Sequence, residues 1–357
     1  MEMKSADKNF DYTYGEKRIG MREYRIPCEP FDLYGIKYCE ESGCFLRMPR
    51  KIAQNISEGV TNFSAYTAGG RLRFSTNSVY FGIKVRYDGL NFMSTMPLCS
   101  ACGFVLLEET ERRPLFLHVL TPERTEECGF ERTVRLPGGK MRHYILYFPL
   151  YNGVRDLRIF LDTDAAVAHG KKYRDLPPVV YYGSSITEGA CATRPDNAYE
   201  AFICNWNKID FVNLGFGGQA RGEKAMAEYL ASADCSLFVC DYDYNAPDAS
   251  YLERTHYKFY EVYRRKKPNV PILFLTKPDT DTNFFDAEER RNVVYESYCR
   301  ALRTGDKNVY FADGSTLFGR KDRSQCTVDG CHPNDVGYYK MAQNIYKKMI
   351  SVNKAFR

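Results

Sequence analysis

The stretch from residue 179 to residue 189 reads VVYYGSSITEG, an apolar run that ends in a loop of small and polar residues. A short apolar run that ends at a glycine predicts a strand buried on both faces of a sheet. Further runs of this kind follow in residues 210–215, 236–241, 271–276 and 309–313. The C-terminal half of the chain is therefore expected to contain a series of buried strands.

Helical patterns separate these apolar runs. They cover residues 198–206, 222–232, 251–266 and 286–302, and a last one covers about 334–352. Alternation of strands and helices predicts a parallel sheet covered by helices on both faces, which is a three-layer α/β domain. In such a domain ligands bind beyond the carboxyl ends of the strands. The loops that follow the strands are therefore the first place to look for chemistry.

Residues 30–165 show a different period. Phe81, Ile83 and Val85 alternate with polar residues such as Lys84, which is typical of a half-buried strand. Further short runs follow in residues 103–109, 114–120, 131–136, 142–151 and 154–161. Several short strands without a long helical pattern predict an all-β sandwich or jelly roll.

Two glycine-containing pairs lie between adjacent runs of this half, at Gly138-Gly139 and Asn152-Gly153. Such residues tolerate positive φ angles, so we expect each pair to close a tight hairpin. The change of period along the chain also sets the expected boundaries. They are an N-terminal extension in residues 1–29, a β-sandwich domain in 30–170, a linker in 171–178 and an α/β domain in 179–357.

Composition excludes several classes of protein. Hydrophobic residues make up 44% of the chain and charged residues 27%, so a largely disordered chain is excluded. Fifty basic residues against 45 acidic ones leave a formal charge of +5, too balanced to indicate nucleic-acid binding. No apolar run approaches the roughly 20 residues of a membrane helix. We therefore expect neither a nucleic-acid partner nor a membrane partner.

The chain contains 13 cysteines, an odd number at irregular spacing. Cys99 and Cys102 form the only CxxC pair, and a zinc ribbon would need a second pair. The N-terminus has no apolar stretch of the kind that secretory signals carry. These features predict free thiols in a cytoplasmic protein and no metal site.

Each predicted strand of the C-terminal half is followed by a polar or glycine-rich loop. A serine hydroxyl is a weak nucleophile that needs a base within hydrogen-bond reach. Of the five histidines, only His332 follows the last strand in a loop at this edge, and Asp329 could fold back to hold its other ring nitrogen. Gly218, Asn245 and the N–H of Ser185 could then donate to a developing oxyanion.

In the loops that follow these strands, the sequence resembles the SGNH, or GDSL-type, superfamily of esterases and acylhydrolases. Residues 183–186 (GSSI) resemble the GDSL block, 215–218 the second block, Asn245 the oxyanion asparagine and 329–332 (DGCH) the DxxH block. The resemblance implies a three-layer, flavodoxin-like hydrolase domain. The upstream strands are similar to the jelly-roll domain that precedes the hydrolase in some carbohydrate-esterase-like members.

The resemblance also implies roles for individual residues. Ser185 would be the nucleophile, His332 the general base and Asp329 the residue that orients it. The oxyanion hole would consist of the N–H groups of Ser185 and Gly218 and the side chain of Asn245. Hydrolysis by these residues would need no metal and no cofactor. Ser184 stands where the family has aspartate, and the segment around Asn245 lacks the family's glycine and final aspartate.

Simpler structural interpretations exist for several of these residues. Ser184 or Ser185 could only cap a helix, as serines after strands usually do. Asp241 and Asp243 could bind backbone N–H groups. Arg71 lies on a predicted strand, as does Arg73, where a solvated strand face is the simpler interpretation.

The leading hypothesis for function is a serine esterase that removes acetyl or other short acyl groups from a carbohydrate. A second hypothesis is a lipid or thioester acylhydrolase with the same triad. A third is an inactive carbohydrate-binding protein. The expected partner is a small-molecule or oligosaccharide ester, and the sequence leaves the oligomeric state open.

Overall fold

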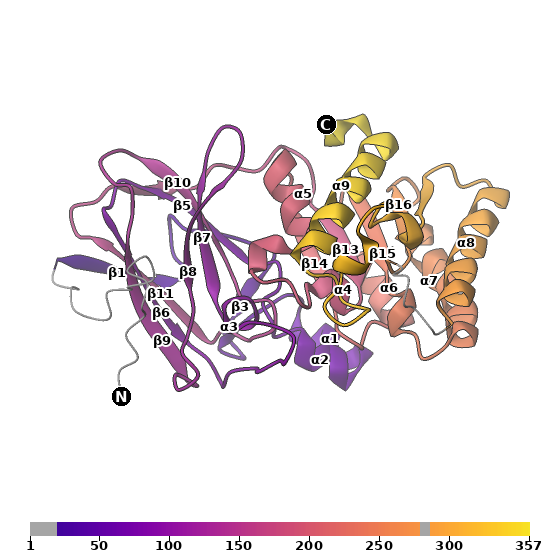
Figure 1. Cartoon of the computed structure of the whole chain (residues 1–357), viewed down its shortest axis with the longest axis horizontal. Helices are drawn as coiled ribbons and strands as arrows, with labels where there is room; N and C mark the ends of the chain where they lie inside the picture. Colours follow the sequence, from indigo (N-terminus) through magenta and orange to yellow (C-terminus); the bar gives the residue numbers. More distant parts are fainter. Residues whose placement is uncertain (1–19, 279–285) are drawn as a thin grey trace.

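The computed structural model describes residues 20–278 and 286–357. Two bodies lie side by side, a β sandwich built from the first half of the chain and an α/β domain built from the second (Figure 1). The predicted fold class is confirmed in both halves.

Two antiparallel sheets form the sandwich. The first has the strand order β1 (Met21–Ile26), β11 (Asp156–Asp162), β6 (Tyr80–Arg86), β9 (Gly129–Arg135). The second has the order β12 (Val167–His169), β5 (Arg71–Thr76), β10 (Arg142–Tyr147), β7 (Phe104–Glu109), β8 (Leu115–Leu120), and β2 (Asp32–Tyr34) also pairs with β5. A small hairpin is made of β3 (Lys37–Cys39) and β4 (Cys44–Leu46).

The prediction of tight hairpins at Gly138-Gly139 and Asn152-Gly153 is wrong. Strand β9 pairs with β6, whereas β10 pairs with β5 and β7, so the first turn crosses from one sheet to the other. The second turn also crosses, because β11 returns to the first sheet between β1 and β6. Strands β7 and β8 pair within one sheet, whereas β9, β10 and β11 alternate between the two sheets. Turn chemistry alone does not say which strand a turn leads to.

Strand β1 falls within the segment expected as an N-terminal extension. It pairs with β11 along its whole length, from Met21 opposite Asp162 to Ile26 opposite Leu157. Residues 1–19 of that segment lie outside the described residues. The structure thus adds a strand to the sandwich, and the domain boundaries stay a prediction.

The α/β domain contains a five-stranded parallel sheet. Its order is β14 (Phe211–Gly215), β13 (Val179–Gly183), β15 (Leu237–Asp241), β16 (Ile272–Leu275), β17 (Val309–Ala312). The first strand in sequence therefore lies between the second and the third, as in flavodoxin-like sheets. This reversal opens a crevice at the carboxyl end of β13, which is where Ser185 follows the strand.

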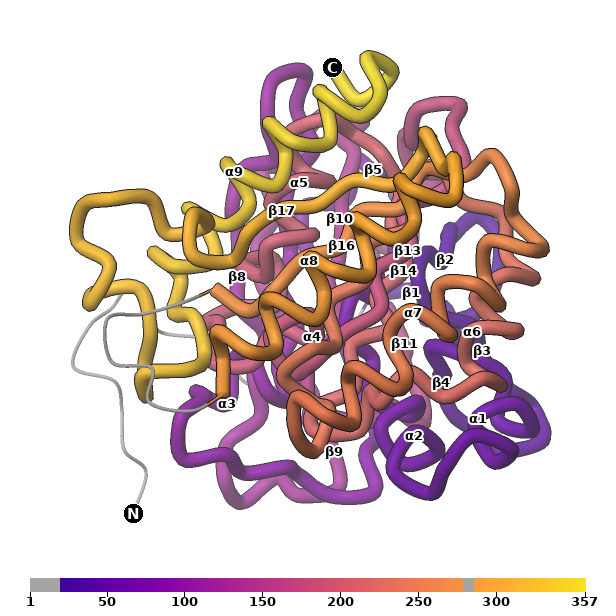
Figure 2. The backbone as a smooth tube through the Cα atoms, turned by 90° about the vertical axis from the view of Figure 1, so that its right-hand side faces the viewer, coloured from indigo at the N-terminus to yellow at the C-terminus, as the bar shows by residue number. Residues whose placement is uncertain are grey.

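Helices cover both faces of this sheet (Figure 2). Alternate side chains of β13 point to opposite faces, with Tyr181 in one hydrophobic core and Tyr182 in the other. Helices α5 (Tyr199–Asn207) and α9 (Asp335–Val352) pack on the Tyr181 side. The Tyr182 side is covered by α6 (Lys224–Leu230), α7 (Ala249–Lys266) and α8 (Ala287–Arg303). None of the helices in the described residues has the length and apolar character of a membrane span.

Two short helices of the first half were not foreseen. They are α1 (Arg50–Ile56) and α2 (Glu58–Phe63), which follow the hairpin β3–β4 in the chain and lie beside α6 (Figure 1). Ala53 and Val60 belong to the same core as Met226 and Leu230 of α6. Each helix has fewer than two full turns, too short to show a helical period in the sequence. A third short helix, α3 (Leu98–Ala101), contains Cys99, and all 13 cysteines are free.

The prediction that Arg71 and Arg73 lie on a solvated strand face is wrong, because both side chains are buried. Arg71 crosses the domain boundary and donates to Asp210 Oδ1 over 2.9 Å and to the carbonyl of Phe211 over 2.7 Å. Arg73 pairs with Glu109, and its guanidinium lies over the ring of Tyr173. Arg71 is therefore buried against the second domain, and Arg73 is buried beside Tyr173 of the expected linker.

Glu200 on α5 has a buried carboxyl group whose protonation state should change with pH. Burial raises its pKa to about 8 from an ordinary value of 4.5, even though Asn213 donates a hydrogen bond to Oε1. Between these two pKa values the folded state binds more protons than the unfolded state. The contribution of Glu200 to stability is therefore lost as pH rises from about 4.5 to about 8.

We therefore expect Glu200→Gln to raise the melting temperature relative to the wild type at pH 9 by several degrees, and not at pH 5. Thermal melts followed by circular dichroism at both pH values measure this difference. Glu41→Gln, at a side chain that is 77% exposed, is the matched control and should change neither melt. An equal shift of Glu200→Gln at both pH values would contradict a neutral Glu200.

Candidate active site

Ser185 lies at the carboxyl end of the central strand β13. The strand ends at Gly183, and α4 (Ser185–Glu188) begins two residues later. The hydroxyl of Ser184 caps this helix by accepting a hydrogen bond from the N–H of Ile186 over 3.2 Å. The capping interpretation thus holds for Ser184, which stands in place of the family's aspartate, and it leaves the hydroxyl of Ser185 free for another partner.

That partner is His332. Ser185 Oγ lies 2.9 Å from His332 Nε2, and His332 Nδ1 lies 2.8 Å from Asp329 Oδ2. The two bonds use both ring nitrogens and form one chain from hydroxyl to imidazole to carboxylate. The structure thus brings together residues that lie 147 positions apart in the sequence, in the geometry by which a base activates a serine.

A tight turn holds Asp329 and His332 in place. Asp329 Oδ1 accepts hydrogen bonds from the N–H groups of Cys331 and His332, over 3.0 and 2.7 Å. Gly330 supplies a φ angle of +80°, which a glycine adopts without strain. An antiparallel bridge between Thr327 and Pro333 closes the turn. The DxxH spacing therefore has a local reason, because the aspartate binds the backbone and the ring of the same turn.

The electrostatics of the turn keep Asp329 ionised. Partial burial acts to raise the pKa of this carboxyl, but hydrogen bonds from the backbone and the ring of His332 outweigh it and lower the pKa below the ordinary value. A carboxylate is therefore present at neutral pH beside the ring nitrogen Nδ1.

Gly218 and Asn245 lie in the loops that follow β14 and β15, the two neighbours of β13. Asn245 Nδ2 donates to the carbonyl of Phe216 over 2.7 Å, so the two loops are tied to each other. Gly218 is exposed and has a φ angle of +69°. Within the described residues, the N–H groups of Ser185 and Gly218 have no acceptor. They remain available as donors at this edge of the sheet.

Buried groups hold the loop that carries Asn245. Asp243 accepts hydrogen bonds from the N–H groups of Tyr244 and Lys277, over 3.0 Å each. Arg290 of α8 donates to the carbonyls of Asp243 and Ala246, over 2.7 Å each. The structural interpretation of Asp243 is therefore the one the geometry supports, and Arg290 is a part of the site's scaffold that the sequence pattern did not reveal.

Asp241 and Glu188 also hold the loops of the site. Asp241 Oδ2 accepts from the hydroxyl of Thr187 over 2.8 Å. Glu188, three residues after Ser185, accepts from the N–H of Gly217 over 2.8 Å and pairs with Arg47 of the first domain. No spacing rule points to Glu188, because its cationic partner lies 141 positions away in the sequence.

Cys191 lies beside Asp329 and His332. One ligand atom each of Cys191, Asp329 and His332 lies within 4.8 Å of the others, so a metal ion could be held there. The same His332 and Asp329 atoms make the bonds described above, and a metal would compete with them. The sequence did not single out Cys191, since nothing about residue 191 indicates that it neighbours residue 332.

Two family models match this chain. Residues 177–351 match the GDSL-like lipase/acylhydrolase family, and residues 27–167 match a family described as the N-terminus of SGNH-hydrolase-type esterases. The chain belongs to the GDSL/SGNH hydrolases. This superfamily consists of carboxylic-ester hydrolases, and the chain is accordingly an enzyme of that class. A comparison with curated protein sequences returned no match.

Solved structures share the whole two-domain architecture of this GDSL/SGNH hydrolase. A protein from Bacteroides ovatus described as a GDSL-like lipase is 24% identical with a TM-score of 0.85, covering 94% of this chain and 98% of that one. A salicylyl-acyltransferase from a tetracycline biosynthetic pathway is 17% identical with a TM-score of 0.79, covering 96% and 100%. A family two carbohydrate esterase from Clostridium thermocellum, in complex with cellohexaose, is 14% identical with a TM-score of 0.61, covering 81% and 94%. At these identities the likeness shows the fold alone.

Proposed function

We propose that the protein is a serine esterase in which Ser185 is the nucleophile, His332 the general base and Asp329 the residue that orients it. The observation that carries the proposal is the unbroken chain of two hydrogen bonds from Ser185 Oγ to Asp329. It lies at the carboxyl edge of a parallel sheet, where ligands bind in this type of fold.

The reaction follows from that geometry. His332 Nε2 takes the proton of Ser185 as the hydroxyl attacks the ester carbonyl, and Asp329 stabilises the resulting imidazolium. The tetrahedral oxyanion receives donors from the N–H groups of Ser185 and Gly218 and from Asn245. His332 then protonates the leaving alcohol, and water repeats the sequence to release the acid and restore Ser185.

For the substrate we propose a short acyl ester, an acetyl ester first of all, on a carbohydrate. The support is the shared two-domain fold of the carbohydrate esterases, one of which was solved with cellohexaose. A lipid or thioester acylhydrolase is the alternative that uses the same residues. The cytoplasmic location likewise stays a prediction from the sequence.

A panel of p-nitrophenyl esters from acetyl to octanoyl, followed by acetylated oligosaccharides, tests the substrate. We expect kcat/KM to be highest for acetyl and to fall as the chain lengthens, and we expect acetate release from the oligosaccharides. A rate that rises toward octanoyl would favour the acylhydrolase. Failure of a fluorophosphonate to label the wild-type serine would favour the inactive carbohydrate-binding protein, since labelling needs an activated hydroxyl.

Asn245→Ala should lower kcat by a factor of roughly 10²–10³, because one oxyanion donor is lost. KM for the acetyl ester should stay within about threefold, since that donor acts mainly in the transition state. Steady-state kinetics on p-nitrophenyl acetate measure both values. Asn344→Ala is the matched control, because its amide donates to the Leu317 carbonyl in another part of the domain. A kcat for Asn245→Ala equal to that of the control would remove Asn245 from the oxyanion hole.

A further inference from the structure

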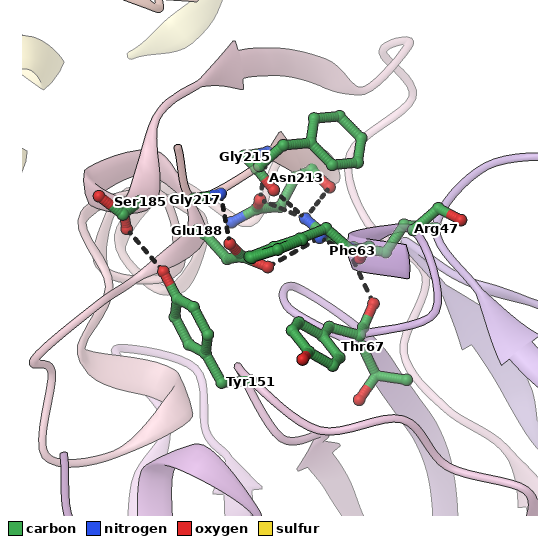
Figure 3. A network of polar contacts seen from close by, with 12 residues as sticks. Arg47, Phe63, Thr67, Tyr151, Ser185, Glu188, Asn213, Gly215 and Gly217 are labelled. Carbon is green, nitrogen blue, oxygen red and sulfur yellow. Dashed lines mark hydrogen bonds and ion pairs between the residues drawn. The ribbon is translucent and has the colours of Figure 1, made fainter. Parts of the chain in front are cut away.

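Arg47 crosses from the first domain into the active-site end of the second. It follows β4 directly, and its side chain is completely buried. Figure 3 shows its guanidinium surrounded by groups from both domains. Removing a charge from water is costly unless it is paired and fully hydrogen-bonded, so the partners of this group explain why it can be buried there.

Every nitrogen of the guanidinium has an acceptor. Nε donates to the Tyr66 carbonyl over 2.9 Å, and Nη2 donates to the Phe63 carbonyl over 2.6 Å. Nη1 donates to the Gly215 carbonyl over 2.5 Å, and Nη2 also pairs with Glu188 Oε1 over 2.8 Å. Arg47 thereby joins the end of helix α2 to the end of strand β14 and to the helix of Ser185.

Glu188 passes this connection on to the proposed reaction centre. It lies three residues after Ser185 on α4, and its side chain is also completely buried. While Oε1 binds Arg47, Oε2 accepts from the N–H of Gly217 over 2.8 Å. Gly217 directly precedes Gly218, a proposed oxyanion donor. One carboxylate thus links the nucleophile's helix, the oxyanion loop and the first domain.

The surroundings leave these groups little freedom. A Cβ on Gly217 would lie 3.1 Å from the Phe63 ring and 3.4 Å from the Tyr151 hydroxyl, both from the first domain. A Cβ on Gly215 would collide with the backbone of Glu188. The Tyr151 hydroxyl also donates to the carbonyl of Ser185 over 3.4 Å (Figure 3). The first domain therefore contacts both the nucleophile's residue and the oxyanion loop.

We propose that Arg47 is a positioning residue, through which the first domain sets the alignment of Ser185 with the Gly217-Gly218 loop by way of Glu188. The first domain is then part of the catalytic unit, whether or not it also binds sugar. This inference rests on the proposed function, because it assigns Arg47 to the same reaction. A buried ion pair brings little net stability once its desolvation is counted, which is consistent with a role in geometry.

A second buried ion pair across the same boundary provides a matched control. Arg71 is as deeply buried as Arg47 and also binds a carboxylate and a carbonyl of the second domain, those of Asp210 and Phe211. These partners lie at the amino end of β14, whereas Gly215 lies at its carboxyl end. Loss of either arginine removes an interdomain pair, but only Arg47 contacts the loops of the active site.

The experiment compares Arg47→Met, Arg47→Lys and Arg71→Met in the full-length chain, below each variant's melting temperature. We expect Arg47→Met to lower kcat for p-nitrophenyl acetate by roughly 10–100-fold with KM within about threefold, because displacements of about 1 Å at a reaction centre have effects of this size. Arg47→Lys should lose less, since it keeps the charge beside Glu188. Arg71→Met should keep kcat within about twofold even where its melting temperature falls as far.

Labelling of Ser185 by a fluorophosphonate separates the two proposals. We expect slower labelling for Arg47→Met and an unchanged rate for Arg71→Met. If Arg47→Met does not fold, a fall in the kcat of Arg47→Lys beyond that of Arg71→Met supports the proposal. Equal kcat values for folded arginine variants at both sites would overturn the role of Arg47 and leave the esterase intact. A wild-type protein that neither turns over esters nor labels would overturn the proposed function itself.

Discussion

Replacing Ser185 by alanine is expected to lower kcat for p-nitrophenyl acetate by a factor on the order of 10⁴ or more, which in practice abolishes turnover. Without the hydroxyl there is no acyl-enzyme, and His332 has no proton to remove. The residual turnover is then direct attack by water on the bound ester, which the oxyanion donors still accelerate. Steady-state kinetics and mass spectrometry of the fluorophosphonate adduct measure both consequences.

The neighbouring serine offers the control for this prediction. Ser184→Ala removes the N-cap of α4 and should lower the free energy of unfolding by about 0.5–2 kcal/mol. It leaves the Ser185 hydroxyl on His332, so the adduct should still form and kcat should fall far less than in Ser185→Ala. If Ser185→Ala kept the wild-type kcat, Ser185 would not be the nucleophile, whatever its distance from His332.

Asp329→Asn is expected to have the next largest effect, lowering kcat at pH 7 by a factor on the order of 10⁴. An asparagine amide can donate to His332 Nδ1, which places the ring proton on Nε2. The nitrogen that faces Ser185 Oγ at 2.9 Å would then be a donor and could not accept the serine proton. The measurement is a pH–rate profile of kcat/KM.

The fold of this variant should change little. The oxygen of asparagine can still accept from the N–H groups of Cys331 and His332, as Asp329 Oδ1 does over 3.0 and 2.7 Å. A melting temperature close to the wild-type value would therefore accompany the loss of rate. Activity within tenfold of the wild type at pH 7 would show that His332 needs no carboxylate partner.

The elements that could be predicted from the sequence are those specified by near neighbours. The run Val179–Gly183 became β13 with the expected bounds, because four apolar residues before a glycine suit a strand buried on both faces. The DxxH turn was recognisable because Asp329 binds its own turn. The tight glycine turn at residues 138–139 was recognisable as a turn, but the sequence did not show that the next strand lies in the other sheet.

The sequence by itself thus determined the order of strands and helices, the edge of the sheet where chemistry collects, and the candidate trio Ser185, His332 and Asp329. Only the tertiary structure decided that Arg71 is buried, that β9 and β10 lie in different sheets, and that Arg47 reaches the helix of Ser185. The physical reason is the separation along the sequence of the residues that interact. Periodicity, caps and turns depend on residues a few positions apart, whereas Arg47 can be buried only because Glu188, 141 positions away, is folded against it.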